Sequence, residues 1–518
     1  MRWRWHPLLF AIYPVLFLYA RNSGNLPAGV LTRPLVVAVA FGLVIWAASR
    51  LVTRDGARGA LLATGALVLW SAYGHVHELM GESFAGQHRV LLPVWMSLVV
   101  WLIVMTRRGQ PMMAPAPAQD LERAAILLGV VLLAYPSIRI AGVLLDPPEE
   151  PRPYNMGKYT PGQEPHKTHP DADIYHIILD GYGRADILSE LYNHDNTPFI
   201  DALRARGFCV SDSARANYTQ TLLSLVRTLG GGVSMAGDFG HDPDSADRRL
   251  LARELKRVVR RGPLPWYCDW TRAFATGYTA TEVIDADQYL APVVSLNEFE
   301  RALAATTPLG VLMNLVESRY GDWLHRRLVE FTFAHLAVAP NDPPRAFTFA
   351  HIIAPHPPFV FAPPSVTAGA MVPLADGDHV IDGNGLTIDQ YRAAYRAQIV
   401  AVNERTLRAL DAILANGRAS IILLHGDHGP GSLLRWEERI PQPAAARERL
   451  GILLAVRIPD PGPDICDRAE TPAGMRSELM ACLWNTAPRE SFDRSYFSTW
   501  SRPFDFVEIG PDGEVIMP

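Results

Sequence analysis

The stretch Ile421–Gly429 reads IILLHGDHG, so a short apolar run ends directly in histidine, glycine and aspartate. Far upstream, the apolar run Ile174–Leu179 ends in a similar way, in DGYG. Apolar runs of this length are typical of buried, parallel strands. In open α/β sheets, ligands bind just beyond the carboxyl ends of such strands. We therefore expect Asp180, Asp427 and His428 to converge on one site.

These two acids and one histidine are a donor set that could hold a divalent metal. Carboxylates combined with imidazole suit Zn²⁺ or Mn²⁺ better than Ca²⁺ or Mg²⁺. The alternative is structural: an Asx turn and glycine caps would simply close two ordinary strands. The sequence predicts a metal site at Asp180, Asp427 and His428, with Zn or Mn as the cofactor.

From residue 171 onward, strand-like and helix-like segments alternate along the chain. This alternation predicts an α/β domain with a mainly parallel sheet and helices on both faces. Residues 234–345 are hard to assign and are expected to include insertions over the sheet. The expected strands are Ile174–Leu179, Phe208–Ser211, Ala346–Ile353, Ser420–Leu424 and Ile452–Ile458; the expected helices are Ile187–Tyr192, Pro198–Arg206, Leu222–Leu229 and Ile388–Ala415.

The first 148 residues have a different character, because five apolar stretches follow one another. A cleaved signal peptide would explain only the first of them. The last stretch reaches the ~20 residues needed to cross hydrocarbon, and the others do so with their flanking residues. We expect a multi-pass membrane domain of about five helices, at Leu8–Ala20, Pro34–Ser49, Ala60–Tyr73, Val90–Met105 and Ala124–Leu145.

Arginine positions predict the orientation of this domain. With a cytoplasmic N-terminus, eight arginines fall on the inside and three on the outside, as the positive-inside rule requires. Five crossings then put the α/β domain outside the cytoplasm, in the periplasm or at the cell surface. The inside arginines are Arg2, Arg4, Arg50, Arg54, Arg58, Arg107, Arg108 and Arg123, and the outside ones are Arg21, Arg33 and Arg89.

Charge and composition divide the chain into three parts. Residues 1–148 form the transmembrane domain, residues 149–170 a linker rich in proline and charge, and residues 171–518 the catalytic domain. The chain has a formal net charge of −5; its first 148 residues carry +6, which leaves −11 for the rest. An acidic outer part argues against nucleic acid as a partner.

Two threonines precede the expected helix Leu222–Leu229. The first turn of a helix offers free N–H groups and a positive dipole end, so it can hold a phosphate. A hydroxyl there that touches a divalent metal becomes a usable nucleophile. Alternatively, Thr219 or Thr221 is simply the helix N-cap.

Two histidines stand at the end of the expected strand Ala346–Ile353. His356 is flanked by prolines in a rigid loop, and His351 lies five residues upstream. A histidine there could stabilise charge on a transferring phosphoryl group or protonate a leaving oxygen. The alternative is a structural role for both.

The ordered set of motifs resembles the alkaline phosphatase/sulfatase superfamily, and above all its membrane phosphotransferases, the lipoteichoic acid synthases and phosphoethanolamine transferases. Those families also have five membrane helices and an extracytoplasmic catalytic domain. Asp427-His428-Gly429 matches their late metal pair, Asp180 their first acidic ligand, and Thr221-Leu222-Leu223-Ser224 their nucleophile segment. The resemblance implies that Thr221 is a metal-bound nucleophile with Thr219 as its neighbour, and that the loop bearing His356, with His351 upstream, binds substrate.

The chain also departs from the pattern of those families. They carry a further histidine about a dozen residues after Asp-His-Gly, whereas Pro430–Ile440 contains Arg435 and no histidine. Arg435 is therefore our candidate for that substrate contact. The sulfatase nucleophile pattern Cys-x-Pro-x-Arg is absent, because Cys209 is followed by Val210, Ser211 and Asp212.

The resemblance implies a multi-pass protein of the cell (inner) membrane. Its activity would be metal-dependent transfer of a phosphoglycerol or phosphoethanolamine type of head group from a membrane lipid. The acceptor would be an envelope glycan or lipid, and the path would run through a threonine intermediate. The alternatives are a sulfatase-like hydrolase of phosphate or sulfate esters, and a non-catalytic envelope protein on the same fold.

Four cysteines remain, and disulfides are allowed outside the cytoplasm. Cys466 and Cys482 are close enough in sequence to close a modest loop. Cys209 is expected to be a small buried apolar residue, although Cys268 could pair with it. Sequence leaves the connectivity open.

Overall fold

The chain forms two compact units in a computed structural model. The first unit comprises Met1–Glu150 and Val294–Arg319, and the second comprises Pro151–Val293 and Tyr320–Pro518. The predicted boundaries at residues 148 and 170 remain predictions, and the excursion Val294–Arg319 was not among them. The residues described are 4–23, 28–81, 83–107, 115–145, 171–229, 272–277, 286, 288–290, 296–336, 346–367, 381, 386–459, 465–484 and 493–516.

Helices are the regular elements of the first unit among its described residues. Within them, four helices are long and apolar enough to cross a membrane, covering Gly29–Thr53, Gly56–Met80, His88–Thr106 and Ala118–Val143. The helix α1 has 17 residues and does not reach that length, so the count of five crossings remains a prediction. The elements are α1 (His6–Asn22), η1 (Ala28–Leu31), α2 (Thr32–Thr53), α3 (Gly56–Met80), η2 (Phe84–Gly86), α4 (His88–Thr106), α5 (Pro115–Leu145), α11 (Glu298–Ala305) and the start of α12 (Leu309–His335).

The second unit is built on a seven-stranded sheet in the order β2-β7-β6-β1-β5-β3-β4. The central strands are parallel, and β7 is antiparallel to both of its neighbours. This confirms the predicted mainly parallel α/β sheet. The strands are β1 (Asp173–Leu179), β2 (Phe208–Val210), β3 (Arg272–Gly277), β4 (Gln288–Leu290), β5 (Ala346–Ile352), β6 (Ser420–His425) and β7 (Leu454–Arg457); β8 (Ser495–Phe497) pairs with β9 (Val507–Ile509).

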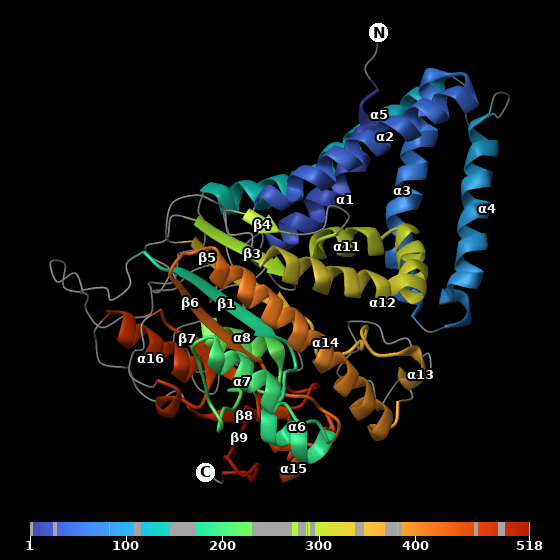
Figure 1. The fold of residues 1–518 in the computed structure, drawn as a ribbon. Helices are drawn as coiled ribbons and strands as arrows, with labels where there is room; N and C mark the ends of the chain where they lie inside the picture. Colours follow the sequence, from blue (N-terminus) through green and yellow to red (C-terminus); the bar gives the residue numbers. More distant parts are fainter. Residues whose placement is uncertain are drawn as a thin grey trace. The chain divides into compact units, whose positions relative to one another are not determined.

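Helices cover both faces of this sheet, which explains its continuous apolar strands. Along β1 and β6, alternate residues enter two separate cores: Ile178 and Leu423 belong to one, and Ile177 and Leu424 to the other. Helix α14 packs on the second core and crosses that face in Figure 1, whereas α8 and α16 pack on the first. The helices are α6 (Ala185–Tyr192), α7 (Thr197–Ala205), α8 (Thr221–Leu229), α13 (Pro364–Thr367), α14 (Ile388–Ala415), α15 (Pro443–Leu450) and α16 (Pro472–Trp484), with the short η6 (Cys466–Arg468).

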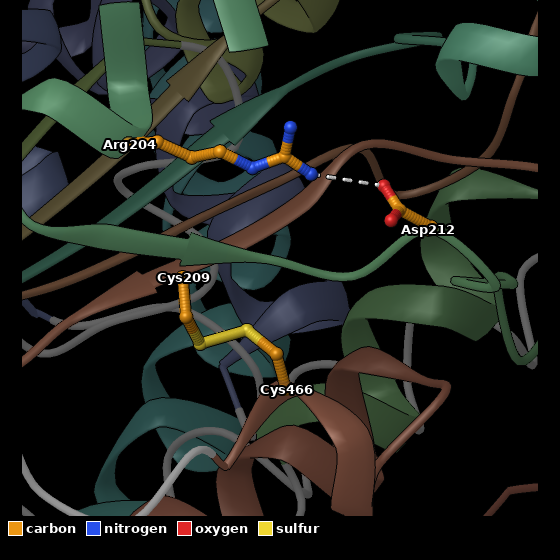
Figure 2. Close-up of a disulfide and its surroundings, with 4 residues drawn as sticks. All are labelled: Arg204, Cys209, Asp212 and Cys466. Carbon is orange, nitrogen blue, oxygen red and sulfur yellow. Dashed lines mark hydrogen bonds and ion pairs between the residues drawn. A yellow bond between two sulfur atoms is a disulfide. The ribbon is translucent and has the colours of Figure 1, made fainter. Parts of the chain in front are cut away.

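A disulfide joins Cys209 of β2 to Cys466 of η6, with the Cα atoms 6.0 Å apart (Figure 2). The suggested pair of Cys466 with Cys482 is therefore wrong, and Cys482 is a half-buried thiol outside this disulfide. The expectation of an unpaired Cys209 is wrong too, and Cys268 lies outside the described residues. Tertiary folding brings together cysteines 257 positions apart, which sequence spacing alone could not indicate.

Candidate active site

The site lies where β1, β5 and β6 end side by side. Because β1 is hydrogen-bonded in parallel to both neighbours, Ile178 pairs with His351 on one side and with His425 on the other. The alternation along these strands directs both histidines to the face that α8 covers. Asp180 follows β1 directly, so its side chain emerges at the same edge.

Three of the predicted metal ligands come together there. The imidazole Nε2 of His428 lies 3.5 Å from Asp180 Oδ1 and 3.4 Å from Asp427 Oδ2. The three side chains are almost completely buried. Two histidines extend this cluster. Potential ligand atoms of Asp180, His356 and His428 lie within 4.8 Å of one another, and so do those of Asp180, His351 and Asp427. The convergence of Asp180, Asp427 and His428 expected from the sequence is therefore present in the structure.

The carboxylate oxygens provide a test of whether a cation fits. One oxygen of each acid is held: Asp427 Oδ1 accepts from the Gly181 N–H at 3.1 Å, and Asp180 Oδ2 lies 3.2 Å from His351 Nε2. The other two, Asp180 Oδ1 and Asp427 Oδ2, are buried and accept no hydrogen bond from any described residue. Burying such a carboxylate oxygen costs several kcal/mol unless a cation compensates it. A divalent metal fits this donor set.

Hydrogen bonds fix which nitrogen each histidine presents to the centre. The Nδ1 of His428 lies 3.0 Å from the Gly429 carbonyl, and the Nδ1 of His356 lies 2.7 Å from the Pro357 carbonyl. Because a carbonyl only accepts, the proton of each neutral ring sits on Nδ1. Each Nε2 is then left with its lone pair, which is the form that binds a metal or accepts a proton.

Thr221 is the first residue of α8 and the half-buried hydroxyl of the site. Its Oγ1 lies 3.1 Å from His428 Nε2. The loop before it is anchored, since the Gln220 amide donates to the Ser498 and Thr499 carbonyls. Thr219, the neighbouring candidate, is fully buried, and its Oγ1 has no hydrogen-bond partner. Thr221 is thus the threonine that borders the ligand cluster.

Sequence reasoning missed Arg449, a buried cation beside these groups. Its Nε donates to the Thr219 carbonyl at 2.9 Å, one terminal nitrogen donates to the Gly429 carbonyl at 3.3 Å, and the other lies 3.1 Å from His428 Nε2. The guanidinium also stacks over Trp436. In the sequence it ends the charged run Arg447-Glu448-Arg449, which looks like a solvated helix end, so no signal marked it.

Arg435, the predicted substrate contact, is exposed on the loop after Asp427-His428-Gly429 and is not part of the buried cluster. Glu448 holds that loop. This buried carboxylate accepts from the Ser432 N–H and hydroxyl and from the Leu433 N–H. The substrate role of Arg435 remains a prediction.

The electrostatics of the site favour the ionised form of Asp180. Burial raises the pKa of Asp180, but the nearby His356, a hydrogen bond from His351 and the charge of His428 outweigh it, so the pKa lies well below its ordinary value. Behind the site, burial lowers the pKa of His425 to about 4, and burial also lowers that of His325 to about 4.

We expect the second unit to lose stability as the pH falls from about 6.5 to about 4. The ordinary histidine pKa is 6.5, so in this window the unfolded chain binds protons that folded His325 and His425 do not. Above pH 6.5 their contribution to the free energy of unfolding is complete. As the pH falls below 6.5, that free energy decreases by ~1.4 kcal/mol per pH unit for each histidine. The contribution of Asp180 is lost only below its ordinary value of 3.8.

Denaturant unfolding across this pH range would measure the slope. The variant His325→Gln should reduce the slope by about one proton, because glutamine does not titrate. An unchanged slope in that variant would show that His325 does not supply the effect.

No family model matches the sequence, and no curated protein matches it. Solved structures do match, and one of them is a protein in the alkaline phosphatase superfamily from Vibrio parahaemolyticus (12% identity, TM-score 0.34, covering 68% of this chain and 80% of that one).

Two phosphoethanolamine transferases and a hydrolase are also among the similar structures. The integral membrane lipooligosaccharide phosphoethanolamine transferase A from Neisseria meningitidis has 11% identity and TM-score 0.38, covering 94% of this chain and 97% of its own. The C-terminal periplasmic domain of EptC from Escherichia coli, solved with Zn, has 12% and 0.38, covering 67% and 94%. Phosphonate monoester hydrolase of Agrobacterium radiobacter has 17% and 0.38, covering 63% and 80%.

All of these similarities have TM-scores below 0.5. At such identities the likeness concerns the fold alone, and the chemistry of this chain has to come from its own side chains.

Proposed function

We propose that this chain is a membrane-anchored phosphotransferase that moves a phosphoryl-linked head group from a lipid to an envelope acceptor. The observation that carries the proposal is the position of Thr221. Its hydroxyl stands at a helix N-terminus, 3.1 Å from His428 Nε2, at the border of a buried cluster with two unpaired carboxylate oxygens. A nucleophile, an anion site and a metal site therefore coincide.

Asp180, Asp427 and His428 would hold the metal, Zn or Mn, with Thr221 beside them. When bound, the metal lowers the pKa of a neighbouring hydroxyl and offsets negative charge. The Thr221 hydroxyl gives up its proton to a neighbouring base as its oxygen attacks the phosphorus of a phosphodiester; a new O–P bond forms, and the bond to the lipid alcohol breaks. The departing alkoxide takes up a proton and leaves as the neutral alcohol.

The second step regenerates the threonine. An acceptor alcohol attacks the phosphothreonine, and its proton goes to a base as the threonine O–P bond breaks. His356 is suited to this role, because its Nδ1 is engaged by the Pro357 carbonyl and its Nε2 lone pair remains. With an envelope alcohol as acceptor the chain is a transferase, and with water it is a hydrolase.

The helices of the first unit support a membrane lipid as donor. Four of them are long and apolar enough to cross a bilayer, so the enzyme and a lipid donor would share one plane. The arginine distribution puts the second unit outside the cytoplasm, where the Cys209–Cys466 disulfide is chemically stable. We therefore propose an inner-membrane protein whose active site faces the periplasm or cell surface.

Covalent trapping tests the proposal on the full-length chain in vesicles. Metal content is measured first, and intact mass is then recorded after incubation with phosphatidylglycerol or phosphatidylethanolamine. A stoichiometric divalent metal and an adduct on Thr221 are expected, and the adduct mass names the transferred group. Products formed with and without an acceptor alcohol separate transfer from hydrolysis. A folded chain that binds no divalent metal would contradict the proposal.

Arg449→Gln is expected to lower kcat by roughly 10²-fold and to leave the metal in place. The guanidinium lies beside His428 and the Thr219 carbonyl, so it adds positive charge where a phosphoryl group would sit; removal of one such donor has an effect of this size in other enzymes. Steady-state kinetics and metal analysis would measure both quantities.

Arg449→Lys is the matched variant, since it keeps the charge but cannot span three partners. It should recover part of kcat. If Arg449→Gln lowers only the unfolding temperature and not kcat, the residue is purely structural.

A further inference from the structure

Helix α12 carries an exposed apolar stripe along its first half. Leu309, Leu312, Val316, Tyr320 and Trp323 recur at spacings of three and four residues, which places them on one face of a helix. All five are exposed, Leu312 by 54% and Trp323 by 55%. Scattered exposed apolar residues are ordinary, but a contiguous stripe of five marks an interaction surface.

The character of the helix changes just after Trp323. After the exposed Leu324 come the exposed Arg326 and Arg327, and the guanidinium of Arg327 lies 5.2 Å from the centre of the Trp323 ring. The opposite side of this second half is buried, with Val329 and Phe333 in the core of the second unit. An apolar face that ends in tryptophan and arginine is typical of the boundary between hydrocarbon and water.

The segment that leads into α12 is packed on the membrane helices. The ring of Phe299 in α11 meets Tyr19 of α1 edge to face, with centroids 6.4 Å apart. Glu300, buried, forms an ion pair with Arg33 of α2. Both contacts lie within the first unit, so α11 is an integral part of it.

The third contact joins one backbone to another. The Gly74 N–H of α3 donates to the Thr306 carbonyl at 2.8 Å, and a Cβ on residue 74 would lie 2.2 Å from the Ala305 carbonyl oxygen. Only glycine admits this approach. The chain leaves Thr306 and begins α12 at Leu309, so the stripe starts directly beside the membrane helices.

The three contacts all involve helix ends on the same side of the proposed membrane domain. Tyr19 ends α1, Arg33 begins α2, and Gly74 lies near the end of α3; these are the ends that the arginine distribution puts outside the cytoplasm. We propose that α12 from Leu309 to Trp323 lies in the outer membrane–water interface, with its apolar stripe against lipid acyl chains. The inference rests on the proposed membrane location of the first unit.

Fluorescence quenching in vesicles tests this placement. In the full chain with Cys268→Ser and Cys482→Ser, Leu312→Cys is labelled with bimane and reconstituted with phosphatidylcholines that bear a nitroxide either near the head group or deep in the acyl chain. Val130→Cys on α5 is the membrane control, and Val400→Cys on α14 is the matched exposed control, as both positions are about half exposed. Quenching of the label at 312 should exceed that at 400 by at least about twofold.

Each outcome decides a different point. Strong lipid quenching at 312 and 130, with little at 400, supports the proposal. Quenching at 130 but not at 312 overturns it and leaves the membrane location intact, whereas no quenching at 130 overturns the membrane location and the inference with it. A label at 312 shielded from aqueous iodide but not quenched by lipid would mean that another protein surface covers α12, which also overturns the proposal.

Discussion

Thr221→Ala is expected to reduce turnover of the lipid donor by roughly 10⁴-fold, because the covalent path is closed when the nucleophile is removed. The half-buried Thr221 hydroxyl lies within hydrogen-bond distance of His428 Nε2, and this contact is within the site rather than to the surrounding backbone. Folding should therefore survive, and the covalent adduct should disappear. Single-turnover kinetics and intact mass would measure both effects.

Thr221→Ser is the control for this variant. It keeps a hydroxyl at the start of α8 and should retain the adduct and much of the turnover. An alanine variant that still forms a covalent adduct would show that another residue is the nucleophile, and Thr219, two positions earlier and fully buried, would be the next to change.

Asp427→Asn is expected to weaken divalent-metal binding by at least about 10²-fold, as loss of a charged ligand does, while making the metal-free protein more stable. The asparagine keeps the acceptor for the Gly181 N–H and replaces Oδ2, a buried oxygen that accepts no hydrogen bond, with a neutral group. Metal titration would measure the loss of affinity, and thermal unfolding in the presence of a chelator would measure the gain in stability of the metal-free protein.

Asp173→Asn is the matched control, because Asp173 is also a buried acid but stands at the opposite end of β1. It pairs with Arg418 at 2.7 Å and accepts from the Ala346 N–H. Removing its charge leaves a half-buried guanidinium uncompensated and should destabilise the protein without affecting metal binding. If both variants shift the unfolding temperature in the same direction, the two buried oxygens of the site are not a metal cradle.

The central strands and the polar residues that directly follow them could be predicted from the sequence. An apolar run buried on both faces reads as a central parallel strand, and the polar residue just beyond it stands at the sheet edge where ligands bind. This is why Asp180, Asp427 and His428 could be grouped across a long separation in sequence. Thr221 could be added because a helix start is visible in the pattern.

Other parts depend on contacts that no local pattern encodes. Arg449 ends a short polar helix and looks solvated, yet the fold turns it inward to Thr219 and Gly429. The cysteine pairing came from the packing of β2 against η6, not from spacing. The strands β3 and β4 lie in a region of the sequence with no clear periodicity, and they extend the sheet beyond β5.

The discontinuity of the first unit sets an order of assembly. Its helices leave the ribosome well before Val294–Arg319, the segment that completes the unit. Until that segment is synthesised, the Thr306 carbonyl that accepts from the Gly74 N–H is missing. With the proposed membrane placement, the intervening chain is translocated before the first unit is complete, so assembly of the first unit and export of the second become one coupled event. Cleavage of the linker at residues 149–170 would therefore leave Val294–Arg319, a part of the first unit, attached to the second unit.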